Sequence, residues 1–160
     1  MSRVKTSSIL QLETSCEKIV SDIREIIKEM GEYKIDDESS SQERVDNPNS
    51  FYQIARNAFA NEKWDLALCH VASMRRCTND NAHLLVAMVY SRPDIREARY
   101  DIAILHLEEI LRKKTEEKRV EKFRDLVQQA LKLQQKLEET ERCIDIEEEK
   151  KSQTHHCFCF

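Results

Sequence analysis

One sequence pattern occurs twice in this chain at a fixed offset. Residues 64–74 read WDLALCHVASM, and residues 100–110, which begin 36 residues later, read YDIAILHLEEI. Three residues are identical in both copies: Asp65 and Asp101, Ala67 and Ala103, and His70 and His106. A repeat of this length is typical of stacked supersecondary units, which bury their apolar faces only against one another. It therefore predicts a helical surface for binding another protein and argues against a catalytic centre.

The composition favours helix and limits the partners. The 160 residues include only one Gly and two Pro, and 35% of them are charged, against roughly 25% in an average globular domain. A net charge of −4 argues against nucleic acid, because phosphate binding needs a clustered positive surface. With one Gly a phosphate-cradling loop is nearly excluded, and the nucleophile-elbow and His-Glu-x-x-His motifs are absent. We therefore expect an all-α protein that is not an enzyme and holds no cofactor.

The chain shows no sequence signal for membrane insertion or secretion. No stretch approaches the roughly 20 apolar residues that span a bilayer, and the first residues, MSRVKTSS, lack the apolar run of a signal peptide. We therefore expect a cytoplasmic protein. Of the six Cys, the first four (Cys16, Cys69, Cys77 and Cys143) lie in helical patterns without framework spacing, which predicts reduced thiols used as small apolar residues.

The first third of the chain predicts a helix followed by a linker. Apolar residues recur every three or four positions from Ile9 to Tyr33, which is a heptad stripe. This stripe, in a segment assigned to residues 1–33, can pack on the body of its own chain or pair with another chain and form an oligomer. Residues 34–50 contain little apolar surface and three consecutive Ser, so they predict a flexible polar linker.

The middle of the chain predicts two helical hairpins. Helix-like apolar faces fall at 51–59 and 64–74, joined by the turn Asn-Glu-Lys, and again at 84–90 and 100–111, joined by a longer turn. Asn49 or Ser50 is expected to cap the first of these helices, and the run 79–81, Asn-Asp-Asn, the third. A charged helix from Thr115 then carries a heptad stripe that thins after Leu137, which is typical of a helix capping a repeat array. We assign residues 51–142 to the repeat domain with this capping helix and 143–160 to a tail.

Residues 51–111 resemble the tetratricopeptide repeat family, whose unit is an antiparallel helix pair of 34 residues. The first hairpin matches the pattern of small and bulky positions, whereas the second needs about three extra residues before Tyr100 and neither unit ends in Pro. The resemblance implies that the following residues hold the repeats together: Ala55, Trp64, Ala67, Val71, Tyr100, Ala103 and Leu107.

The same resemblance implies a concave groove that is lined by the first helix of each pair and receives a peptide or helix of a partner protein. The residues implied for this groove are Tyr52, Arg56, Phe59, His83 and Met88. One subgroup of the family grips acidic chaperone tails with Lys and Asn at set positions of these helices. Tyr52 and Arg56 occupy the corresponding positions here, so chaperone-tail binding is disfavoured.

Two further sets of residues are candidates for chemistry. His70 and His106 lie a full repeat apart with no equivalent carboxylate or thiol beside them, which favours a repeated packing position over a metal site. Cys157 stands fourth from the C-terminus, before Phe158, Cys159 and Phe160, in the register of a prenylation box. If it is lipidated we expect peripheral membrane association; an unmodified tail and a metal-binding tract of His155, His156, Cys157 and Cys159 are the alternatives.

Together these observations predict a non-catalytic adaptor or scaffold that binds a protein segment through a tetratricopeptide-like groove. A coiled-coil subunit of a larger assembly, joined through residues 9–33, is the alternative. A metal-binding protein that uses the tail is the least favoured hypothesis.

Overall fold

The fold is all-α, as the sequence predicts. The computed structural model describes residues 7–31, 33, 35, 50–74, 79–93, 98–114 and 116–157, and these residues form helices and turns without a strand. The helices are α1 (Ser7–Met30), α3 (Phe51–Ala60), α4 (Trp64–Ala72), α5 (Asp80–Ser91), α6 (Tyr100–Lys113) and α7 (Lys118–Cys157).

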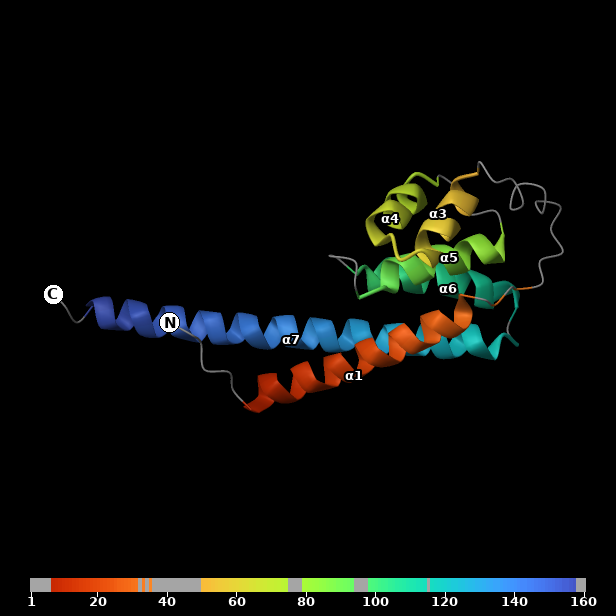
Figure 1. Ribbon diagram of the computed structural model, residues 1–160. Helices are drawn as coiled ribbons and strands as arrows, with labels where there is room; N and C mark the ends of the chain where they lie inside the picture. The colour runs from red at the N-terminus through yellow and green to blue at the C-terminus, as the bar shows by residue number, and fades with distance from the viewer. Residues whose placement is uncertain are drawn as a thin grey trace.

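The helices stack in three layers (Figure 1): α3 with α4, α5 with α6, and α1 with α7. The first two layers are the predicted hairpins. Helices α3 and α4 both contact α5, and α6 contacts α7, so each layer buries the apolar face of the next. A single hydrophobic core runs through all three layers.

Local sequence signals set the ends of the hairpin helices. The hydroxyl of Ser50 accepts a hydrogen bond from the backbone N–H of Gln53 (3.1 Å), and the side chain of Asn79 accepts one from Ala82 (2.7 Å), so both predicted caps are confirmed. Residues 61–63 form the short α3–α4 turn, in which Glu62 adopts a left-handed φ of 59°. The α5–α6 hairpin is closed by a hydrogen bond from the backbone N–H of Arg99 to the carbonyl of Tyr90 (2.8 Å).

Small residues allow the hairpin helices to approach closely. Ala55, Ala67 and Ala103 have no exposed surface, and each lies at a position implied by the repeat resemblance. The other residues named for packing are buried in the core (Val71, Tyr100 and Leu107) or pack against it (Trp64). The residues that the resemblance implies for packing therefore lie in the core or against it, whereas Phe51, on the predicted apolar face of residues 51–59, is 53% exposed.

Helix α1 packs antiparallel to α7 within the same chain (Figure 1). Its heptad stripe supplies Ile23, and α7 supplies Phe123 and Val127, all fully buried. The end of α1 is held to the start of α7 by a hydrogen bond from the hydroxyl of Tyr33 to the carboxylate of Glu117. The stripe predicted to pack either within the chain or between chains is thus buried against the chain's own C-terminal helix.

The polar residue that interrupts the α7 stripe lies beside a gap in the packing. Gln134 lines a cavity of about 190 Å³ between α1, α6 and α7, together with Cys16 of α1 and Tyr100 of α6. Burial raises the pKa of the Tyr100 hydroxyl and of the Cys16 thiol, since it disfavours their anions.

Two features differ in detail from the sequence analysis. The C-terminal helix does not end near residue 142 but continues as α7 to Cys157, because residues 143–157 contain neither Gly nor Pro and are rich in Glu and Lys. Ile35, within the predicted linker, is buried with only 2% of its surface exposed. Apart from Ile35 and Ser50, the linker residues 34–50 lie outside the described residues.

Candidate protein-binding groove

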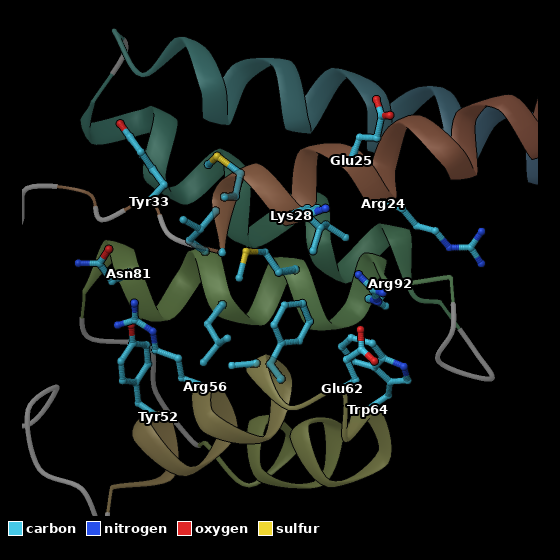
Figure 2. Close-up of a pocket in the computed structure, with 18 residues that line it drawn as sticks. Arg24, Glu25, Lys28, Tyr33, Tyr52, Arg56, Glu62, Trp64, Asn81 and Arg92 are labelled. Atoms are coloured by element: carbon cyan, nitrogen blue, oxygen red, sulfur yellow. The ribbon is translucent and has the colours of Figure 1, made fainter.

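A groove of about 530 Å³ lies between α1, α3 and α5 (Figure 2). Its apolar lining comes from all three helices: Ile27 and Met30 of α1, Phe59 of α3, and Leu84, Leu85 and Met88 of α5. Helices α3 and α5 are the first helices of the two hairpins, which are the helices expected to line a binding surface. Concave sites of this volume with a mainly apolar lining are typical of binding sites.

A cluster of two aromatic rings and one cation closes one end of the groove. The rings of Phe59 and Trp64 meet edge to face with centroids 5.3 Å apart. The guanidinium carbon of Arg92, which follows α5, lies 3.9 Å from the Trp64 ring centroid and 6.0 Å from that of Phe59. A cation held over an indole face in this way is stabilised by about 0.5–2 kcal/mol. The contact fixes the Arg92 head group at the edge of the groove (Figure 2).

An amide side chain defines the opposite end. The side-chain oxygen of Asn81 accepts a hydrogen bond from the backbone N–H of Ile35 (2.9 Å), and its amide N–H donates to the carbonyl of Ile35 (3.0 Å). This pair of bonds ties the segment that follows α1 to the start of α5. Tyr52 and Arg56 of α3 line the groove at the same end (Figure 2).

The charged side chains of the groove are mainly cationic. Arg24 and Lys28 of α1, Arg56 of α3 and Arg92 line it, against Glu25 and Glu62. In the view of Figure 2, Glu25 points away from α5. The described residues of the lining thus carry a formal charge of +2, in a chain whose net charge is −4. The sign of the charge in the groove is therefore opposite to that of the chain as a whole.

Four of the five residues implied for the groove line it: Tyr52, Arg56, Phe59 and Met88. The fifth, His83, does not, and this prediction is wrong. The residues at α5 that line the groove are Asn81, Leu84, Leu85 and Met88, together with Arg92 directly after the helix. Their spacing of three or four residues places them on one helix face. His83 lies off that face and points to α6, where its Nδ1 is 2.9 Å from the Nδ1 of His106.

The repeated histidines occupy equivalent packing positions. His70 of α4 lies against Phe51 at the start of α3, with ring centroids 6.2 Å apart, and His106 of α6 lies against His83 near the start of α5, 5.1 Å apart. Each histidine therefore faces the first helix of its own hairpin. Burial, with a smaller contribution from the neighbouring His83, lowers the pKa of His106. One imidazole of the pair then donates the Nδ1 hydrogen bond and the other accepts it.

The α1 wall of the groove and the His83–His106 pair were not identified from the sequence. The pair could have been found from the hairpin register, because His83 lies seven residues before Tyr90 and His106 seven residues after Arg99. Residues placed symmetrically about a hairpin turn face each other. The α1 residues carry no comparable signal, since their position depends on how α1 crosses the stacked hairpins.

The remaining candidate residues are the possible metal ligands and the cysteines. In the ranges the structure describes, no three His, Cys, Asp or Glu side chains converge as metal ligands. Cys69 and Cys143 are exposed free thiols, so the expectation that they replace apolar residues is wrong. Cys77, the side chain of Cys157 and residues 158–160 lie outside the described residues, and lipidation of Cys157 stays a prediction.

Across the part of the chain that the structure describes, no helix combines enough length and apolar content to cross a bilayer.

Comparisons with known proteins give no relative for this chain. No protein-family model, no curated protein and no solved structure matches it.

Proposed function

We propose that this protein is a non-catalytic adaptor whose groove between α1, α3 and α5 binds a segment of a partner protein. The observation that carries the proposal is the groove itself: about 530 Å³, apolar at its centre and charged at its edges, and lined by the first helix of both hairpins. Interfaces commonly combine an apolar centre with a polar rim. The two hairpins, with small residues at their crossing points, also support membership of the tetratricopeptide-like class.

The alternative, a coiled-coil subunit joined through α1, receives less support. Six residues of α1 are buried within the single chain: Ile9, Ile19, Ile23, Ile26, Ile27 and Met30. A seam that already packs on α7 leaves little apolar surface for a second chain. Sedimentation of the full chain at several concentrations distinguishes the two hypotheses, since a monomer at all concentrations contradicts the coiled-coil alternative.

A blocking substitution tests the groove directly. Ala60, the last residue of α3, is exposed and lines the groove, so Ala60→Trp fills it without disturbing the core. Ala72, the last residue of α4, is also exposed but does not line the groove, and Ala72→Trp is the matched control. Both variants should keep the wild-type circular dichroism spectrum.

Peptides would be selected against the full-length wild-type protein from a displayed random library. We expect selected peptides to bind the Ala60→Trp variant at least about tenfold more weakly, which is about 1.4 kcal/mol, and the Ala72→Trp variant with unchanged affinity. Selected peptides that bind all three proteins equally would show that binding occurs elsewhere. A library that yields no binder would contradict the proposal outright.

A further inference from the structure

We infer that the segment received by the groove is an acidic amphipathic helix. This inference rests on the proposed function and adds the chemistry of the partner. Three observations support it. The charge around the groove is mainly positive, the amide of Asn81 is already hydrogen-bonded to the backbone of Ile35, and the apolar and charged side chains of the lining are distributed over three helices.

Charge selects an anionic partner. Lys28 on α1 and Arg56 on α3 come from opposite walls of the groove, and Arg92 is held at its end by the Trp64 ring. A segment with carboxylates along both of its edges would meet a cation on each side. Complementary charge also steers such a segment toward the groove.

The polar groups of the groove favour a helix over an extended peptide. An extended segment needs side-chain amides or backbone groups that bond to its N–H and C=O groups. Among the described residues that line the groove, Asn81 is the one side-chain amide, and both ends of that amide are bonded to Ile35. A helix satisfies its own backbone hydrogen bonds and presents only side chains. The remaining lining, apolar at the centre and cationic at the edges, recognises side chains.

The dimensions of α5 set the length of the partner. This helix has 12 residues and is therefore about 18 Å long, so a partner helix of about three turns extends along it. Apolar residues of the partner at i, i+3 or i+4, and i+7 would contact the accessible apolar surface of the groove, which Tyr52, Phe59 and Trp64 supply. Glu residues on either side of that stripe would approach Lys28 and Arg56.

The probe is a fluorescent synthetic helix of about 18 residues with a Leu stripe, Ala at the remaining positions and Glu on both flanks of the stripe, its length taken from α5 plus one turn at each end. A second peptide has Gln in place of every Glu, and a third has Lys. Fluorescence anisotropy with the full-length protein should give about tenfold tighter binding for the Glu peptide than for the Gln peptide at low salt, and no binding of the Lys peptide. Because salt screens exposed charges, this preference should shrink at about 0.5 M NaCl.

Two double variants test whether Lys28 and Arg56 produce the preference for the Glu peptide. The variant carrying Lys28→Glu and Arg56→Glu should lose the preference for the Glu peptide or reverse it. The control carries Lys18→Glu and Lys132→Glu, which change the net charge equally at exposed positions of α1 and α7 outside the groove, and it should keep the preference. If both variants lose the preference for the Glu peptide equally, the preference comes from the overall charge of the protein, and the inference is overturned.

Different results would contradict this inference and the proposed function. If the Glu and Gln peptides bind equally and Ala60→Trp blocks both, the groove binds a segment but the acidic chemistry is wrong. If library-selected peptides bind in the groove while none of the three helical peptides does, the partner is not an amphipathic helix. If the wild-type protein self-associates in sedimentation and Ala60→Trp makes it monomeric, the occupant is a second copy of this chain, which also overturns the inference.

Discussion

The small residue at position 67 is the most direct test of the hairpin geometry. Ala67 of α4 has no exposed surface, and α4 packs on α3, whose Ala55 and Ala58 are also buried. Leu adds three carbon atoms where the helices already touch. Overpacking of this kind costs about 1–3 kcal/mol. The Ala67→Leu variant should therefore unfold at lower temperature, by about 2 to 12 °C for a chain of this size.

The control for this prediction is Ala72→Leu, the same change on the same helix at an exposed position. Both variants carry the same small difference in helix propensity, so the difference between them reports packing alone. Thermal and urea unfolding, followed by circular dichroism at 222 nm, measures the loss. If Ala67→Leu unfolds within about 1 °C of Ala72→Leu, the close approach of α3 and α4 at Ala67 is wrong.

Three further predictions concern the other contacts. The pKa of His106 is lower in the folded chain than in the unfolded chain, so the unfolded chain binds a proton at this imidazole more readily. The contribution of the neutral imidazole to the free energy of unfolding is therefore complete above about pH 6.5 and is lost as the pH falls through the folded pKa. His106→Gln should weaken the pH dependence of the urea unfolding midpoint between about pH 7 and pH 5. An unchanged pH dependence would show that it arises from other titratable groups. Asn81→Ala removes both bonds to the backbone of Ile35 and should cost about 1–3 kcal/mol in urea unfolding, and a neutral result would mean that these bonds do not hold the segment. Ile23→Ala leaves a cavity between α1 and α7 and should cost about 2–5 kcal/mol, whereas a loss under 0.5 kcal/mol would show that α1 is not docked.

Periodic features of the sequence predicted the helices and their buried faces. The stripe from Ile9 to Tyr33 predicted α1, and the caps at Ser50 and Asn79 predicted where α3 and α5 begin. Such signals are local, since the period of an α-helix and the hydrogen bonds of its first turn involve residues within a few positions of one another. Tyr52, Arg56, Phe59 and Met88 were assigned to the groove from a resemblance, and the structure brings all four to its lining.

The positive charge of the groove could not be predicted from the sequence. Net charge describes the whole chain, so a value of −4 gave no indication that Lys28, Arg56 and Arg92 gather at one place. Lys28 lies on α1, Arg56 on α3, and Arg92 directly after α5. Their proximity follows from the stacking of the layers, which no single segment encodes.

The sequence by itself determined an all-helical chain, the faces that each helix buries and the alanines at which the hairpin helices meet. Only the tertiary structure decided that the α1 stripe packs on α7 of the same chain, that His83 meets His106 instead of lining the groove, and that α1 forms a wall of that groove. The physical reason is that hydrophobic burial is not directional: a heptad stripe requires an apolar partner but does not specify which one. The partner is chosen by the packing of the whole molecule, and the charge and shape of the groove follow from that choice.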